Sequence, residues 1–130
     1  MAKVELTGMD ELLKEIYAIG EKVATRAENK ALREGAEILR VAISERAPRS
    51  KLSKAHLADN IVKSGVKTSK AGIKRIEVGP GKGFFYGKFL ELGTTKMSAK
   101  PFIGPALEEK RSEIFDAMAG VLREELAKKR

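Results

Sequence analysis

The sequence predicts an α+β fold: a long N-terminal helix, a small antiparallel sheet built around a β-hairpin, and a C-terminal helix packed on that sheet. Three observations support it: apolar residues at helical spacing in the first third, two short runs with strand-like alternation in the middle, and an apolar stripe at helical spacing near the end. The 130 residues carry no internal repeat, so one domain over residues 1–130 is expected.

The N-terminal helix is expected to begin near Thr7, whose hydroxyl can cap it, with Asp10 close to the positive end of the helix dipole. Two sets of apolar residues then follow at helical steps, out of phase across Arg26–Lys30, with Gly20 inside the first set. We therefore expect one long helix with a bend, or two nearly collinear helices, that end before Pro48.

The middle of the chain is expected to be a loop followed by a hairpin. Residues 49–55 are polar and basic without an apolar pattern, which predicts a mobile loop. Ile61–Thr68 and Ile73–Gly79 alternate like strands, and residues 69–72 are suited to the turn between them.

The two faces of this hairpin are expected to differ. Because side chains alternate between the faces of a strand, Val62 and Val66 are expected on one face of the first strand and Lys63 and Lys67 on the other. The hairpin is therefore expected to have one apolar face and one basic face.

The net charge of +8 is concentrated in residues 46–75, which contain nine Lys or Arg and one acid, Asp59. The rest of the chain is electrically balanced, with 17 basic and 17 acidic residues. Such a block attracts phosphates or acidic protein surfaces, or forms a solvated hairpin. Most of its cations, with one more further along, are the candidates for an interface or for contact with DNA: Arg49, Lys51, Lys54, Lys63, Lys67, Lys70, Lys74, Arg75 and Lys96.

The last third predicts one ambiguous stretch and one clear helix. Phe84–Leu92 is the most apolar stretch of the chain, and its pattern fits a helix and a strand equally well. Gly104-Pro105 is expected to open the C-terminal helix, because proline is favoured at the first helical position.

No catalytic residue, cofactor site or metal site is expected. The chain has no cysteine, and its single histidine, His56, lies on one turn with Ser53 and Asp59, where a catalytic triad rarely converges. Gly79–Gly83 resembles a phosphate-binding loop only loosely, because its lysine is followed by glycine rather than by serine or threonine. Neither a signal peptide nor a membrane-spanning run is recognisable, so an intracellular, soluble protein without membrane contact is expected.

A nucleic-acid-binding protein is the main alternative. The basic block lacks the interleaved aromatic residues of single-strand binders, since all five phenylalanines lie in residues 84–115. Non-specific contact with phosphates through residues 46–75 remains physically reasonable, and so does a solvated strand face whose lysines discourage edge pairing. A free-standing basic DNA-binding protein therefore stays open as a second hypothesis.

The most distinctive segment is residues 85–108. An aromatic-rich stretch ends in Glu91-Leu92-Gly93-Thr94 and is followed by Ala99-Lys100-Pro101-Phe102 and then by Pro105-Ala106-Leu107. This order resembles the signature of a tailed-bacteriophage neck family, also called head–tail joining, tail-completion or minor tail proteins. Ala47-Pro48 at the end of the long helix agrees with it, whereas Ala55-His56 stands where the family commonly has Thr-Gly.

The resemblance implies a structural virion protein that connects head to tail as a subunit of a six-fold ring around a DNA channel. Its implied partners are further copies of itself, adjacent head-completion and tail proteins, and DNA contacted non-specifically in the channel. It implies a place in the virion, and in the host cytoplasm during assembly. Residues 49–55 and 93–100 are the expected contact segments.

The motif also has a physical interpretation. Glu91 can accept backbone amide bonds from the loop that follows it, and Gly93 permits a sharp turn. The prolines stiffen the entry to the last helix, and Phe102 is suited to the core. The residues expected to fix this loop are Glu91, Gly93, Thr94, Pro101, Phe102 and Pro105.

Overall fold

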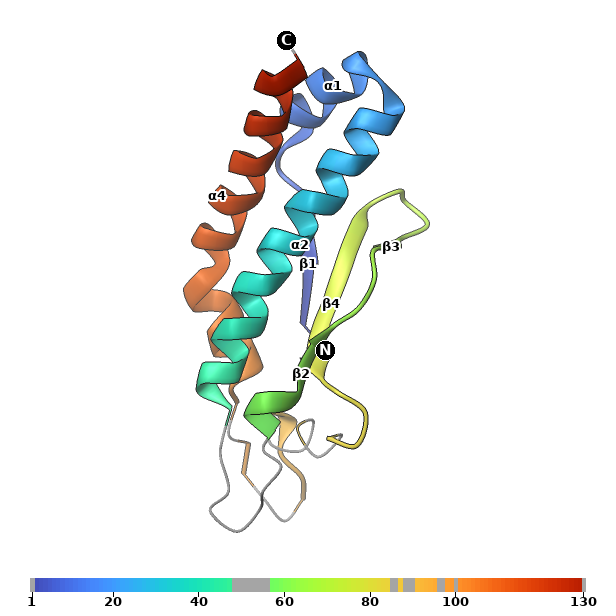
Figure 1. The fold of residues 1–130 in the computed structure, drawn as a ribbon. Helices are drawn as coiled ribbons and strands as arrows, with labels where there is room; N and C mark the ends of the chain where they lie inside the picture. The colour runs from blue at the N-terminus through green and yellow to red at the C-terminus, as the bar shows by residue number, and fades with distance from the viewer. Residues whose placement is uncertain are drawn as a thin grey trace.

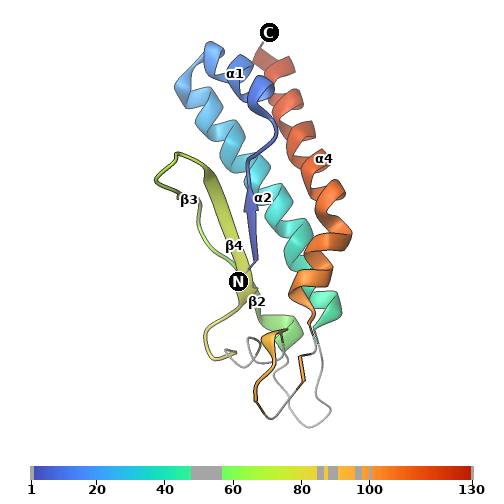
Figure 2. The same cartoon turned by 180° about the vertical axis from the view of Figure 1, so that it is seen from behind.

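The computed structural model of the chain describes residues 2–47, 57–84, 87, 91–95, 98–99 and 101–129. In chain order the elements are β1 (Ala2–Glu5), α1 (Asp10–Ile19), α2 (Glu21–Arg46), a 3₁₀ turn η1 (Leu57–Asn60), β2 (Ile61–Lys63), β3 (Lys67–Thr68), β4 (Lys74–Pro80) and α4 (Ile103–Lys129). The long helices α2 and α4 run side by side, and the sheet packs against α2 (Figures 1 and 2). The predicted α+β class is confirmed.

The sheet is organised around β4, which pairs antiparallel with every other strand. β1 lies on one side of it, and β2 and β3 lie on the other. The N-terminal strand β1 was not predicted, although Ala2, Val4 and Leu6 alternate with polar residues and are buried. Its partner lies far away along the chain, since Val4 pairs with Ile76.

A β-bulge separates β2 from β3. Lys63 lies opposite Val78 and Lys67 lies opposite Arg75, so β2–β3 contains one more residue than the part of β4 it faces. Ser64 occupies the bulge: its amide donates to the Glu77 carbonyl at 2.8 Å, and its hydroxyl oxygen accepts the Glu77 amide at 2.9 Å. The extra residue reverses which side chains of the strand point toward the core.

The predicted faces of the hairpin are corrected by this bulge. Val66 packs against the core as expected, but Val62 is 50% exposed and Ile61, its neighbour, is buried instead. Lys63 therefore lies on the same side as Ile61 and reaches Glu37 of α2. The prediction of an apolar face that excludes Lys63 is wrong, because simple alternation does not hold across an inserted residue.

The N-terminal helical region also differs from the prediction. The first helix begins at Asp10 after Met9, with no side-chain cap, so Thr7 does not cap it. Gly20 separates α1 from α2, and α2 continues unbroken through Arg26–Lys30. The Tyr17 hydroxyl donates to Glu28, yet a continuous helix would separate these residues by about 16 Å along its axis. The two helices are therefore not collinear, and α1 packs on both α2 and α4.

Small residues let α2 and α4 approach closely. A Cβ at Gly35 would lie 3.0 Å from Met118 Cγ on α4 and 3.1 Å from Val4 Cγ1 on β1. Glycine at this position therefore sets the distance between the three elements. The buried face of α2 consists mainly of alanine and glycine, at Ala24, Ala27, Ala31, Gly35, Ala36 and Ala42. Its larger apolar residues are Leu32, Leu39 and Ile43.

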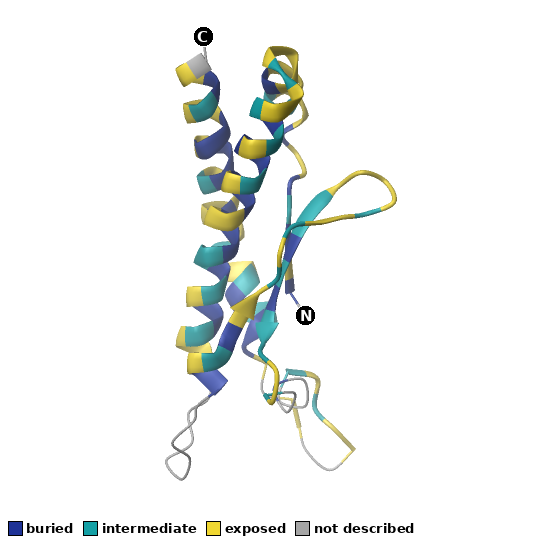
Figure 3. Cartoon of the chain, turned by 45° about the vertical axis from the view of Figure 1, so that its right-hand side comes forward, coloured by how far each residue is buried: buried dark blue, intermediate teal, exposed yellow. Residues whose placement is uncertain are grey.

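The buried residues form one continuous core between the helices and the sheet, while the outer helix surfaces and the hairpin turn are exposed (Figure 3). In the described part of the chain, no helix combines the length and the apolar character needed to cross a membrane.

Two glycine-to-alanine substitutions should have opposite effects on the free energy of unfolding. Gly120 is exposed on α4 and a Cβ there meets nothing within 4 Å, so Gly120→Ala should raise it by about 0.5–1 kcal/mol through helix propensity. Gly35→Ala should lower it by about 1–2 kcal/mol, because Met118 and Val4 must move. Urea denaturation followed by circular dichroism measures both; equal stabilisation by the two substitutions would contradict close packing at Gly35.

Candidate functional site

One carboxylate holds the start of α4. Oε1 of Glu91 accepts the backbone N–H groups of Phe102 and Ile103, each at 2.7 Å, and Oε2 accepts that of Gly104 at 3.0 Å. The first amides of a helix have no partner within the helix, and they form the positive end of its dipole. The carboxylate therefore satisfies three donors and complements the dipole; we call this arrangement the Glu91 cap.

The residues around the Glu91 cap fit its geometry. A Cβ at Gly104 would lie 3.2 Å from Oε2 of Glu91, so glycine leaves room for the carboxylate. Gly93 has a φ of +76°, a left-handed conformation that favours glycine and turns the chain two residues after the capping residue. Phe102 is buried at 2% exposure and anchors the other end of the segment in the core.

The remaining motif residues lie near the surface. Pro105 is half-buried in the first turn of α4, which begins two residues earlier than the proline, while Pro101 and Thr94 are exposed. Leu92 is 76% exposed, the highest value among the large apolar side chains described. The start of α4 is therefore held by the Glu91 cap and by the buried Phe102.

Gly87, which precedes the Glu91 cap in the chain, lies close to the end of β4. In the ambiguous segment Phe84–Leu92, the described residues Gly87, Glu91 and Leu92 are helical, which favours the helical alternative. A Cβ at Gly87 would lie only 2.7 Å from Cγ of Pro80. Glycine at this position therefore permits the contact between this stretch and the sheet.

Two lysines of the basic block point toward α2. The Nζ atom of Lys63 lies 2.6 Å from Glu37, and that of Lys74 lies 3.0 Å from Glu28. The side chains of Lys74 and Glu28 are only 18% and 7% exposed. These lysines bind the hairpin to the long helix, so much of their charge is compensated inside the molecule.

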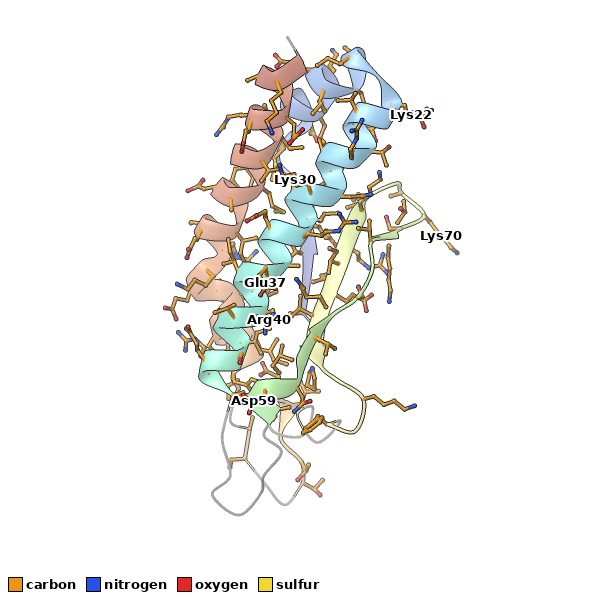
Figure 4. The ribbon with its side chains drawn as sticks, viewed as in Figure 1. Lys22, Lys30, Glu37, Arg40, Asp59 and Lys70 are labelled. Carbon is orange, nitrogen blue, oxygen red and sulfur yellow. The ribbon has the colours of Figure 1, made fainter. Side chains whose placement is uncertain are left out.

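The other cations of the hairpin lie on its outer side. Lys67 and Arg75 each contact Glu77 at 3.3 Å. Lys70, at the turn, has no acidic partner within the part of the chain that the structure describes, and its side chain points away from the helices (Figure 4). Of the other candidate cations, Arg49, Lys51, Lys54 and Lys96 lie outside the described residues, as does His56.

Two glutamates on α2 control the local electrostatics. The hydrogen bond to Glu28, together with burial and the negative charge of Glu28, raises the pKa of Tyr17 to about 12. Hydrogen bonds from Arg40 and then from Lys63 lower the pKa of Glu37 to about 2 (Figure 4). These acids connect α1, α2 and the hairpin.

The sequence alone indicates that Glu28 lies on the buried side of its helix. Glu28 follows Ala24 by four residues and precedes Ala31 by three, which places it on the apolar face of the helix. A carboxylate on that face requires a partner when buried, and Lys74 and Tyr17 provide two. No group of three or more His, Cys, Asp or Glu that could hold a metal ion occurs among the described residues.

One family comparison matches the chain. The family model HK97-gp10_like, described as "Bacteriophage HK97-gp10, putative tail-component", matches residues 10–93. The match runs from the first residue of α1 through β4 and ends two residues after Glu91, so β1 and α4 lie outside it. No curated protein and no solved structure matches the chain.

Removal of the Glu91 carboxylate should destabilise the start of α4. Glu91→Ala leaves three amides without their acceptor, so the free energy of unfolding should fall by about 2–3 kcal/mol. Glu91→Gln keeps the side-chain shape and one acceptor oxygen and should lose about half as much. Urea denaturation measures both. The control is Glu124→Ala on the exposed surface of α4, which should change the free energy of unfolding by less than about 0.5 kcal/mol. If Glu91→Ala lowers stability no more than Glu124→Ala does, the Glu91 cap is contradicted.

The lowered pKa of Glu37 predicts an acid-dependent loss of stability. The pKa is about 2 in the folded protein against an ordinary 4.5, so the folded state favours the charged carboxylate. This contribution is present above about pH 4.5 and is lost as the pH falls toward 2. The melting temperature of Glu37→Gln should therefore fall less than that of the wild type between pH 5 and pH 2. Glu45→Gln, which removes an exposed carboxylate without an ion pair in the described structure, should follow the wild type.

Proposed function

Because this chain belongs to the HK97-gp10-like family of bacteriophage tail components, we propose that it is a subunit of the phage neck that connects the head to the tail. The family makes it a structural protein of a phage virion. The family match over residues 10–93 carries the proposal. The resemblance of residues 85–108 to the neck signature supports the more specific position at the head–tail junction.

In this proposal the subunits form a homo-oligomeric ring of six around the channel that DNA crosses. Adjacent head-completion and tail proteins contact the two sides of the ring. The function is assembly, which requires surfaces held in fixed positions rather than catalytic turnover. A close-packed pair of long helices, with the start of α4 held by the Glu91 cap, is suited to that requirement.

Contact with the DNA in the channel is part of the proposal, but the hairpin supplies less free charge than the sequence suggested. Lys63, Lys67, Lys74 and Arg75 all pair with carboxylates of the same chain. The alternative of a free-standing basic DNA-binding protein has correspondingly less support. Such a protein requires cations available to phosphates and an affinity that falls steeply with salt.

The proposal predicts that the protein is a fixed component of the particle. Mass spectrometry of purified virions should detect it in a constant ratio to the other neck proteins, and removing its gene should give separated heads and tails. Restoring the gene in trans should restore joined particles. Joined, infectious particles that lack the protein would contradict the proposal, and duplex binding that weakens steeply with salt in the absence of any particle association would favour the alternative.

A further inference from the structure

The turn of the hairpin forms a defined projection from the body of the molecule. We call residues 67–73 the hairpin tip; it extends away from the helices (Figures 1 and 3). The Ser69 amide donates to the Ile73 carbonyl at 2.9 Å, and the Gly72 amide donates to the Ser69 carbonyl at 3.0 Å. The tip therefore has a fixed shape and presents exposed Lys70 beside Ile73, which is 36% exposed.

A groove on the outside of the helix pair has the complementary character. The α2–α4 groove, of about 260 Å³, lies between the two long helices. Its floor includes Ile38 and Val41, and Val41 is 39% exposed. The lining residues that matter here are Glu34, Ile38, Val41 and Glu45 from α2, with Lys110 and Glu113 from α4.

The free charge of the α2–α4 groove is negative. Lys110 and Glu113 pair with each other at 3.2 Å and compensate one another. In the described structure Glu34 and Glu45 form no ion pair, and they lie on either side of the apolar floor. Eleven residues of helix separate them by about 16 Å, so they flank the apolar floor along the helix axis.

We propose that the hairpin tip of one copy docks into the α2–α4 groove of the next copy. Ile73 then covers the apolar floor near Val41, and Lys70 lies against Glu34 or Glu45. This inference rests on the proposed function, because a ring requires a contact between two different surfaces of the same chain. The carboxylates of the groove would repel the phosphates of DNA, so a second copy is the occupant that its chemistry favours.

The position of the two surfaces fits a repeating contact. Lys70 points away from the body, whereas Glu37 lines the groove, with its charge paired to Arg40 and Lys63 (Figure 4). One chain therefore cannot satisfy its own groove with its own tip. A contact between unlike surfaces repeats from copy to copy and closes into a ring when the rotation permits. A single hairpin turn buries little area, so the isolated protein should associate only at high concentration.

Charge exchange tests the contact. Lys70→Glu, and separately Glu34→Lys with Glu45→Lys, should each weaken self-association by about tenfold or more in sedimentation velocity, since like charges then meet. Combining the three substitutions in one chain should restore it to within about threefold of the wild type. Matched reversals outside the two surfaces, Lys22→Glu and Asp116→Lys with Glu124→Lys, should leave it unchanged. The proposal is overturned if neither the tip reversal nor the groove reversal weakens self-association, or if the combined chain does not recover it.

Mixing distinguishes this contact from a symmetric one. In an equimolar mixture of the tip variant and the groove variant, every tip meets a groove of opposite charge on the other variant, so the mixture should alternate into oligomers larger than a dimer, which neither variant forms alone. A contact between identical surfaces stops at a dimer, so dimers alone, or no association specific to the mixture, would reject the inference.

Cross-linking gives a readout that does not depend on association in dilute solution. The chain has no cysteine, so Lys70→Cys with Val41→Cys introduces one thiol on each surface. A short bis-maleimide should produce a ladder of oligomers from the double variant and none from either single variant, in concentrated protein or in particles. Particles that contain the protein but give no ladder would reject the interface and leave the neck function standing. A ladder from a protein that is absent from particles would reject the neck function alone. If Lys70→Glu weakens binding to duplex DNA but leaves self-association unchanged, the tip contacts DNA and the proposed interface is rejected.

Discussion

The Glu91 cap fixes the relation between the two halves of the fold. The carboxylate belongs to the stretch that follows the sheet, and its three hydrogen bonds go to amides at the start of α4. Since α4 then packs lengthwise against α2, the position of its first turn sets the register of the largest helix contact. Gly35 allows that contact to be close, and Phe102 anchors the chain where the helix begins. The motif that carries the family resemblance therefore also connects the sheet to α4.

Ion pairs hold the hairpin against α2. Lys63 and Lys74 reach carboxylates on α2, one of which, Glu28, is buried. A buried carboxylate without a partner would be costly, so the hairpin and the helix depend on each other. The large net charge of the sequence consequently overstates the charge that the hairpin offers to a partner. What remains available is concentrated at its turn.

The helices, the hairpin and the interpretation of Glu91 could all be reached from sequence, because each depends on contacts between residues close in the chain or on strong local patterns. Three features could not. β1 is four residues long and acquires its partner only through a distant pairing. The bulge at Ser64 inserts one polar residue, which alternation does not register. The change of direction between α1 and α2 at Gly20 depends on the packing of α1 against α2 and α4. The sequence around Gly20 is itself compatible with a continuous helix.

The pairing of β1 with β4 has a consequence for the order in which the chain folds. Ala2 lies opposite Val78, so the first strand leaves the ribosome long before its partner is made. Closing so long a loop carries an entropic cost that local contacts do not, and β1 also contacts α4, which follows both strands in the chain. During synthesis β1 can therefore pair only after β4 has been made. Until then the apolar side chains of β1 lack the partner strand beside them and remain accessible to other chains.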